Sequence, residues 1–339
     1  MIDLRSLELD QMEELIAGMG HPAFRAKQVF QWIYKGVTDF EQMGNVPKAL
    51  CEQLAEADRI GRLKILEIQK SKSDGTRKYL FELADGCTIE SVFMKYKYGN
   101  SICVSSQAGC RMGCRFCAST RNGLTRHLSP GEILSQLMEA EADTGEKIGH
   151  IVVMGTGEPF DNYDNLSAFL RIVNDKNGLN IGMRNITVST CGLVPMIECF
   201  AEDFPQVNLA ISLHGTTDAI RGSMMPVNKK YPLEVLMPAC RAYTEKTGRR
   251  ITFEYTLVNG VNDADGDAAR LCSLLRGMLC HVNLIPLNKV AESGFDTVSR
   301  GRAMEFQQIL EKRGIPATVR RELGADIDAA CGQLRLGKR

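Results

Sequence analysis

The sequence carries no net charge, because its 41 lysines and arginines are balanced by 41 aspartates and glutamates. Without a global field of one sign, any polyanion would have to be bound by local basic patches. Four stretches are candidates for such patches: residues 70–78, 94–99, 111–127 and 335–339. Taken singly, each stretch is more typical of a solvated face than of a phosphate contact.

The sequence also lacks an uninterrupted apolar run long enough to span a membrane. Its opening, MIDLRSLELDQMEELIAGMG, has scattered acidic residues and no apolar centre, which argues against a secretory signal. We therefore expect a cytoplasmic protein that does not bind membranes. A chain of 339 residues with this composition predicts one large domain with an appendage.

Cysteine, by contrast, is plentiful, with 12 residues. The reducing cytoplasm argues against a disulfide framework, so metal binding or thiol chemistry is the better interpretation. Five cysteines fall in motifs described below. The other seven are interpreted as small buried residues: Cys51, Cys87, Cys191, Cys199, Cys240, Cys272 and Cys280.

The chain divides into four stretches by pattern. Residues 1–60 have apolar positions at helical spacing and predict a small N-terminal helical domain. Residues 61–100 have alternating apolar runs and predict a small antiparallel β extension. Residues 101–320 alternate six short β-rich runs with helical patterns, which predicts an α/β fold, a partial (β/α)6 barrel related to the TIM architecture. Residues 321–339 form a C-terminal segment that contains Cys331.

In a parallel barrel the functional residues follow the strands. The β-rich runs SICVSS, HIVVMG, NITVST, VNLAISL, RITFEYTLV and HVNLIPL are followed by a cysteine cluster and by polar, glycine-containing turns. The turns of interest are GTGEP, STCG, SLHG, NGVND and the position of Asn288. GEP standing alone would be no more than a strand-to-helix turn in about half of cases.

The cysteine cluster is Cys110, Cys114 and Cys117, in the spacing CxxxCxxC. Three thiolates on one short loop can bind an iron–sulfur cube and leave one iron without a protein ligand. Closed iron–sulfur and structural zinc sites have four ligands, so the missing fourth leaves a position for an exogenous molecule. The alternative is a structural zinc site that takes a distant Cys or His as its fourth ligand.

CxxxCxxC with Phe116 before the last cysteine, on a loop that leaves the first barrel strand, resembles the radical S-adenosylmethionine (SAM) superfamily. The resemblance implies a 4Fe–4S cluster on the three cysteines and SAM on its open iron. It also implies SAM contacts from the strand ends. These contacts are Gly157, Glu158, Ser189, Ser212, Leu213, His214 and Asn288. Alone, His214 would more often be a core histidine.

Further motifs, namely CVSSQAGC, VMGTGEPFDN, STCGLVP, NLAISLH, MPVNKKYP, HVNLIPLN and GADIDAACGQL, resemble the RlmN/Cfr family of radical SAM RNA methyltransferases. The resemblance implies that one SAM methylates Cys331 and that a second SAM generates the radical that transfers this carbon to C2 of an adenine. Cys103 then attacks the Cys331 sulfur and forms a transient disulfide, which requires the two thiols to converge. Glu90 matches the proton acceptor, although a strand glutamate alone is usually surface charge.

The implied substrates are 23S rRNA and tRNA, with the target adenine extruded from its stack. The implied partners are a reductant for the cluster, such as flavodoxin or ferredoxin, and a thiol reductant for the disulfide. We expect a monomer. Two alternatives stay open at this point: Cfr-type methylation at adenine C8, and a non-catalytic, metal-stabilised RNA-binding module. Thr156 in GTGEP departs from the methionine expected in many relatives.

Overall fold

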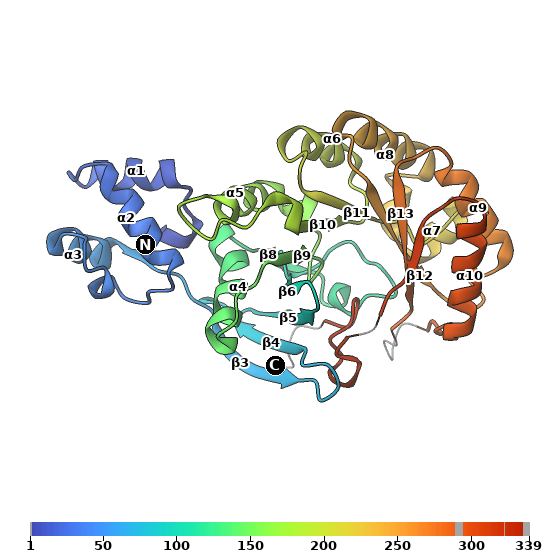
Figure 1. The fold of residues 1–339 in the computed structure, drawn as a ribbon, viewed down its shortest axis with the longest axis horizontal. Coiled ribbons are helices and arrows are strands. Elements are labelled where there is room, and N and C mark those ends of the chain that lie inside the picture. The colour runs from blue at the N-terminus through green and yellow to red at the C-terminus, as the bar shows by residue number, and fades with distance from the viewer. Residues whose placement is uncertain (1, 289–293, 322, 335–339) are drawn as a thin grey trace.

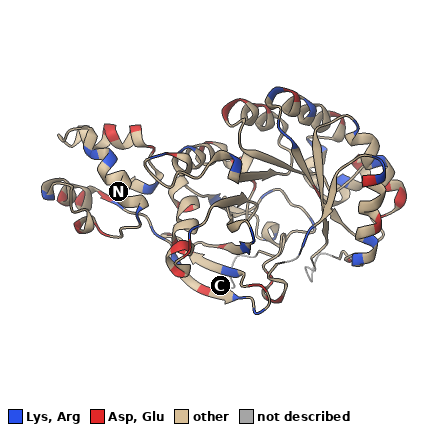
Figure 2. Ribbon diagram, in the orientation of Figure 1, with Lys and Arg blue, Asp and Glu red and all other residues tan. Residues whose placement is uncertain are grey.

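The computed structural model describes residues 2–288, 294–321 and 323–334. The basic patch predicted at 335–339 lies outside these residues. Within them, no helix is both long and apolar enough to cross a membrane. Figure 2 shows basic and acidic residues interspersed along the outer helices, as the zero net charge predicts.

The first 60 residues form the predicted small helical unit, which lies at one end of the molecule (Figure 1). Its elements are β1 (Ile2–Asp3), η1 (Leu4–Ser6), α1 (Leu9–Gly18), α2 (Phe24–Tyr34), η2 (Phe40–Gln42), α3 (Lys48–Ala57) and β2 (Asp58–Arg59). Strands β1 and β2 pair in parallel and bring the two ends of the unit together. The helices bury one apolar stripe each, as their spacing predicts.

A ten-stranded sheet forms the body of the protein, in the order β14-β13-β12-β11-β10-β9-β6-β5-β4-β3. Its antiparallel part consists of β3 (Lys64–Lys70), β4 (Arg77–Glu82) and β5 (Thr88–Tyr96), which pairs with β6 (Gly99–Val104). Its parallel part continues from β6 with β9 (His150–Val153), β10 (Ile186–Thr190), β11 (Asn208–Ser212), β12 (Ile251–Leu257), β13 (Cys280–Pro286) and β14 (Ala317–Val319). The antiparallel extension therefore belongs to the same sheet as the barrel strands.

Helices cover the outer face of the parallel strands (Figure 1). They are α4 (Pro130–Thr144), α5 (Tyr163–Asn174), α6 (Val194–Asp203), α7 (Asp218–Met224), α8 (Leu233–Thr247), α9 (Asp265–Leu275) and α10 (Arg300–Lys312). Short elements lie in the connections: β7 (Gln107–Gly109), η3 (Ala118–Thr120), β8 (Leu124–His127), η4 (Pro159–Asn162), η5 (Met183–Asn185), η6 (Pro226–Lys229) and η7 (Ala325–Ile327). All six predicted barrel strands are present, and β14 adds a seventh parallel strand, so the predicted partial barrel is confirmed.

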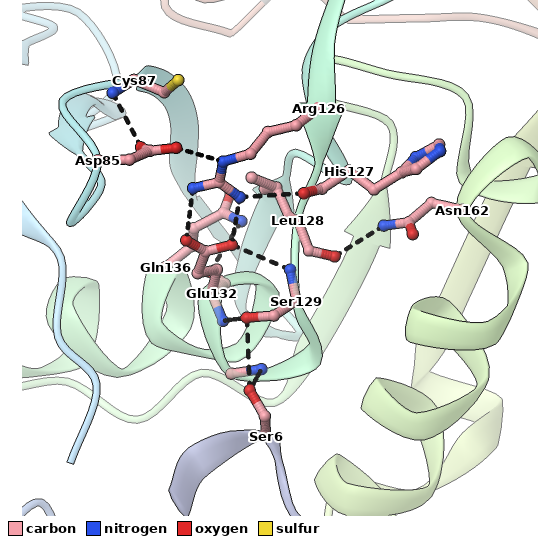
Figure 3. Close-up of polar contacts among 11 residues, drawn as sticks. Ser6, Asp85, Cys87, Arg126, His127, Leu128, Ser129, Glu132, Gln136 and Asn162 are labelled. Atoms are coloured by element: carbon pink, nitrogen blue, oxygen red, sulfur yellow. Dashed lines mark hydrogen bonds and ion pairs between the residues drawn. The ribbon is translucent and has the colours of Figure 1, made fainter. Parts of the chain in front are cut away.

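Helix α4 begins with a capping box that also joins separate parts of the chain (Figure 3). Ser129 Oγ accepts the backbone N–H of Glu132 at 3.2 Å, and the Glu132 carboxylate accepts the backbone N–H of Ser129 at 3.0 Å. Arg126, in β8, donates to both Glu132 oxygens and to Asp85. The hydrogen bond from Arg126 lowers the pKa of Asp85 to about 2. The loop after the cysteine cluster is thereby fastened to α4.

A buried ion-pair network attaches the helical unit to the barrel. Arg5, which is 2 % exposed, donates to Ser135 Oγ at 2.9 Å and to Glu139 at 3.4 Å. Arg62 binds both Glu139 oxygens, at 3.1 and 2.8 Å. One carboxylate of α4 thus holds two arginines that precede the sheet, and its contact with Arg62 has the bidentate geometry that arginine favours.

Candidate active site

The three clustered cysteines lie on the loop after β6, at the carboxyl edge of the parallel strands. Backbone hydrogen bonds set the loop: the N–H of Cys110 donates to the carbonyl of Gly123 at 2.9 Å, and that of Cys117 to the carbonyl of Cys114 at 3.1 Å. Gly109 has a φ of 80°, and a Cβ there would lie 2.1 Å from the Gly123 oxygen, so only glycine fits. These contacts make the loop compact, and all three cysteines line the same cavity.

Burial controls the protonation of these thiols. It raises the pKa of Cys110 to about 12 and raises the pKa values of Cys114 and Cys117, with the neighbouring thiols adding to the effect at Cys114. A bound cation would reverse this preference, because metal ligation deprotonates thiols. Within the described residues, no group of three or more His, Cys, Asp or Glu side chains is close enough to hold one metal ion. A 4Fe–4S cube does not require such a group, since each thiolate binds a different iron.

The cavity contains about 960 Å³ of empty space, including its open mouth, and runs along the carboxyl ends of five successive strands. Its lining includes six residues predicted from the strand ends: Gly157, Glu158, Ser189, Ser212, His214 and Asn288. The three sulfur donors and this lining fit a cluster with an organic ligand beside it. Leu213 differs: its side chain is fully buried in the core and its N–H donates to the carbonyl of Glu254.

Glu158 is a buried carboxylate held by backbone donors. Its Oε2 accepts the N–H of Cys191 at 2.7 Å, and its Oε1 accepts the N–H of Phe160 at 3.0 Å. Its own N–H donates to Gln107 Oε1 at 2.8 Å. Burial nevertheless raises the pKa of Glu158 above its ordinary value. Gly157 has a φ of 111°, and a Cβ there would clash with Gln107, so this turn also requires glycine.

His214 is neutral and its tautomer is set by the backbone. Its Nδ1 accepts the N–H of Thr256 at 2.9 Å, which leaves the proton on Nε2. Burial, with a smaller contribution from Arg221, lowers its pKa to about 3. The ring packs edge-on against Phe116, with 4.9 Å between centroids. His214 therefore braces the aromatic residue of the cysteine loop and contributes a donor to the cavity lining.

A second, adjoining pocket contains both Cys103 and Cys331. It shares Met154, Ile285, Asn288, Arg320 and Cys331 with the larger cavity. Both cysteines are free thiols. Burial, with the neighbouring Cys331 adding to it, raises the pKa of Cys103 to about 12. Two thiols that are 228 residues apart in the numbering thus face one space beside the cysteine loop.

The segment that carries Cys331 is fixed from two sides of the cavity. Asn288 Nδ2 donates to the Cys331 carbonyl at 3.0 Å, and the carbonyl of Gly332 accepts the N–H of Ala118 at 2.8 Å. The Cys331 sulfur accepts a hydrogen bond from Arg320 Nη1 at 2.9 Å. Ala118 belongs to the turn directly after Cys117, so the C-terminal segment and the cysteine loop are in direct contact.

The β3–β4 hairpin holds the other end of this segment. Asp74 Oδ2 accepts the N–H of Gly324 at 2.9 Å, and Asp326 Oδ2 accepts the N–H of Lys72 at 3.0 Å. Lys78 Nζ donates to the carbonyl of Asp328 at 3.2 Å. We call these three contacts the hairpin clasp. The sequence pattern predicts only a basic patch here, whereas Lys78 is buried and directed inward.

Glu90 lies inside the protein, although a lone strand glutamate is usually exposed. It is 8 % exposed, and its carboxylate is 3.6 Å from Lys78 Nζ. Side chains alternate along a strand, so Glu90 shares its face of β5 with Val92 and Met94, which line the Cys103 pocket. Sequence reasoning missed several lining residues, among them the charged side chains of Glu254 and Arg320. Arg320 directly follows β14 and could have been found by applying the strand-end rule to a seventh strand.

Comparisons with known proteins agree with this geometry. Residues 104–272 match the model of the radical SAM superfamily, and residues 2–60 match the model of the ribosomal RNA large subunit methyltransferase N-terminal domain. The chain is 55% identical over 334 residues to a probable dual-specificity RNA methyltransferase RlmN from Alkaliphilus oremlandii, with 98% of this chain and 97% of that protein covered. A namesake from Geobacillus thermodenitrificans is 54% identical over 338 residues, with 98% and 93% covered.

A solved structure is similar over the whole chain. It is a radical SAM methyltransferase from Sphaerobacter thermophilus, with a TM-score of 0.94 and 46% identity. The alignment covers 99% of each chain. The likeness therefore includes the helical unit, the antiparallel strands and the parallel barrel together.

Proposed function

We propose that this chain, which belongs to the RlmN family of radical SAM RNA methyltransferases, adds a methyl group to C2 of an adenine in 23S rRNA and in tRNA. One observation supports this proposal most strongly. Cys103 and Cys331 line a single pocket that adjoins the cavity lined by Cys110, Cys114 and Cys117. The proposed reaction needs this proximity, because Cys331 would carry the methyl group, Cys103 would attack the Cys331 sulfur, and the loop would bind the cluster.

Radical SAM enzymes use a 4Fe–4S cluster and SAM. We assign the cluster to Cys110, Cys114 and Cys117, and the amino acid part of SAM to Gly157 and Glu158. When bound, this cofactor pair supplies both the methyl group and the radical, at two SAM molecules per turnover. The residues of the chain orient it, keep water out and carry the methyl group.

The remaining strand-end residues would hold the rest of SAM. His214 offers its Nε2–H, and Ser189, Ser212 and Asn288 offer hydroxyl and amide groups at the cavity wall. Leu213 contributes through its place in the buried turn, because its side chain belongs to the core. The apolar part of the lining, which includes Met154 and Leu287, limits the water that could quench a radical.

Adenine C2 is electron-poor and does not attack a sulfonium, so the carbon must arrive by another route. Cys331 would accept the methyl group and join it to C2, which tethers the RNA to the protein. Glu90 would accept the C2 proton, and the Lys78 ammonium, 3.6 Å from its carboxylate, would stabilise the charged form before transfer. Cys103 would then attack the Cys331 sulfur, which forms the sulfur–sulfur bond and breaks the bond between that sulfur and the transferred carbon. The electron pair of the broken bond takes up a proton and completes the methyl group on the released RNA, and the disulfide is left for reduction.

An anaerobic methylation assay with the reconstituted protein tests this function. The wild type should produce 2-methyladenosine in rRNA and tRNA fragments by mass spectrometry. Cys331→Ala should produce none, and Cys103→Ala should trap RNA on the protein as a band that survives denaturing gels. Cys280→Ala, at the start of β13 and outside both pockets, is the control. Turnover by Cys331→Ala would refute the methyl-carrier route.

The same assay separates the alternative regiochemistry, since product methylated at C8 would identify Cfr-type activity. Membership in a family of methyltransferases favours an enzyme over the non-catalytic RNA-binding module. We further propose a cytoplasmic monomer that receives electrons from a flavodoxin or ferredoxin and that uses a thiol reductant. Among the basic residues of the hairpin, Lys70 and Lys72 are exposed and suited to RNA phosphates. Arg77 instead pairs with Asp143, and Lys78 pairs with Glu90.

A further inference from the structure

We propose that Arg320 is a positioning residue for Cys331: its guanidinium donates a hydrogen bond to the sulfur and holds it in the orientation that accepts a methyl group. This inference rests on the proposed function of Cys331 as the methyl carrier. Arg320 belongs to none of the motifs that point to the family. It is the first residue after β14, where the strand ends beside both pockets.

The contact is direct and well anchored. Arg320 Nη1 lies 2.9 Å from Cys331 Sγ, which is close for a nitrogen–sulfur hydrogen bond. The backbone N–H of Arg320 donates to the carbonyl of Leu284 at 2.8 Å and continues the pairing of β14 with β13. The guanidinium therefore projects from the end of a hydrogen-bonded strand, whereas Cys331 lies on a loop. Because the strand is the more rigid of the two, Arg320 sets the position of the Cys331 sulfur.

The surroundings of Arg320 favour a negative partner. None of the described carboxylates forms an ion pair with it, and Cys331 Sγ is its hydrogen-bond acceptor. The buried carboxyl of Glu254, fixed by a 2.8 Å hydrogen bond from Asn283 Nδ2, lies near enough to interact with its charge, as do Tyr96 and Cys103. Arginine stays protonated in such a setting, so Arg320 offers the Cys331 sulfur a charged hydrogen-bond donor.

Methyl transfer changes this partnership. The thiolate electron pair forms the new carbon–sulfur bond, the bond between the methyl carbon and the sulfonium sulfur breaks, and its electron pair stays on the departing sulfur. The negative thiolate and the positive sulfonium become two neutral thioethers. A thioether sulfur is a weak hydrogen-bond acceptor, so the hydrogen bond from Arg320 to the methylated Cys331 sulfur becomes much weaker. The residue thus acts on the methyl-accepting step and not on RNA binding.

Arginine and lysine should differ in a graded way. Both are cations, but only the planar guanidinium is preorganised at the end of a strand to direct a hydrogen bond at the sulfur. Arg320→Lys should keep part of the effect through its charge, and Arg320→Met should abolish it while preserving apolar bulk. Arg300→Met is the matched control, because Arg300 is an exposed arginine at the start of α10 and lines neither pocket.

The first experiment measures Cys331 itself in the protein without SAM. The rate of iodoacetamide labelling of Cys331 at pH 7.5 is read by mass spectrometry of its peptide. Arg320→Met should slow labelling about tenfold, as expected for losing one hydrogen bond from a charged donor. Arg320→Lys should give an intermediate rate, and Arg300→Met should match the wild type. An equal or faster rate in Arg320→Met, with an unchanged melting temperature, would overturn the proposal.

The second experiment separates this role from the proposed function. Transfer of a labelled methyl group from SAM to Cys331 is followed in a single turnover without RNA, alongside the Kd for an RNA stem-loop. Arg320→Met should slow S-methylcysteine formation and leave the RNA Kd unchanged. If the wild type forms no S-methylcysteine, the proposed function fails. If the wild type forms it and Arg320→Met matches its rate, only the role of Arg320 fails. If Arg320→Met does not fold, Arg320→Lys decides by the same two readouts.

Discussion

Replacing Glu158 by glutamine isolates the charge of one buried carboxylate. In the structure its two oxygens accept the backbone N–H groups of Cys191 and Phe160, at 2.7 and 3.0 Å. Glutamine has nearly the same shape but carries one oxygen and one NH2 group. Glu158→Gln therefore removes the negative charge and turns one of the two acceptors into a donor that faces another donor.

The size of the effect follows from two opposing contributions. A hydrogen bond to a charged group contributes about 1.5–3 kcal/mol, so losing the proposed contact with the SAM ammonium should weaken SAM binding by about 10- to 150-fold. Stability should change less than SAM affinity. The mismatched N–H destabilises the fold, but removing a buried charge relieves the desolvation that raises the pKa of Glu158.

Equilibrium dialysis of labelled SAM against the anaerobically reconstituted protein measures the affinity, and urea unfolding measures the stability. SAM affinity of the wild type should fall as the pH decreases through the raised pKa of Glu158, which lies above the ordinary 4.5, because protonation removes the anion. Glu158→Gln should not show this transition. Glu141→Gln, whose carboxylate pairs with Lys147 at the end of α4, is the charge-matched control. An unchanged SAM Kd in a folded Glu158→Gln variant would refute the assignment.

Three further predictions concern the clasp, the inter-unit network and the cluster. Asp74→Ala removes the acceptor of the Gly324 N–H, so amide hydrogen exchange in residues 323–334 should accelerate about fivefold or more. Exchange in α4 should not change. An exchange rate in residues 323–334 equal to that of the wild type would exclude a clasp. Glu139→Ala should lower the free energy of unfolding by about 3–5 kcal/mol, since buried Arg5 loses its carboxylate; a loss below about 1 kcal/mol in urea melts would contradict this. Removal of the cluster should make the three CxxxCxxC thiols newly reactive to alkylation, as counted by mass spectrometry; protection unchanged by iron removal would contradict their ligation.

The parts of the fold that repeat at short range are predictable from the sequence. The six β-rich runs form barrel strands because apolar, β-branched residues occur in short runs that suit buried parallel strands. The strand-end rule, applied to the residue pattern alone, locates most of the cavity lining, including Glu158 and His214. The family and the partial barrel are confirmed, whereas the roles of the individual residues stay predictions.

What the sequence did not reveal depends on contacts between distant segments. Lys78 belongs to a basic patch in the sequence, yet it is buried between Glu90 and the carbonyl of Asp328, 250 residues away. Arg320 has no local signal beyond following a short strand. Leu213 shares a motif with His214, but its side chain is buried in the core. The two residues lie in the turn after β11, where His214 has a positive φ of 52° and the chain leaves the strand direction.

The hairpin clasp has a consequence for biogenesis. Its partners, such as Asp74 and Gly324, are 250 residues apart, so the barrel can close before the last stretch of chain has been synthesised. The hairpin clasp acts together with Asn288, Ala118 and Arg320 to hold the segment that brings Cys331 beside Cys103. A chain truncated before Cys331 would therefore hold a cluster-binding loop with no acceptor sulfur beside it.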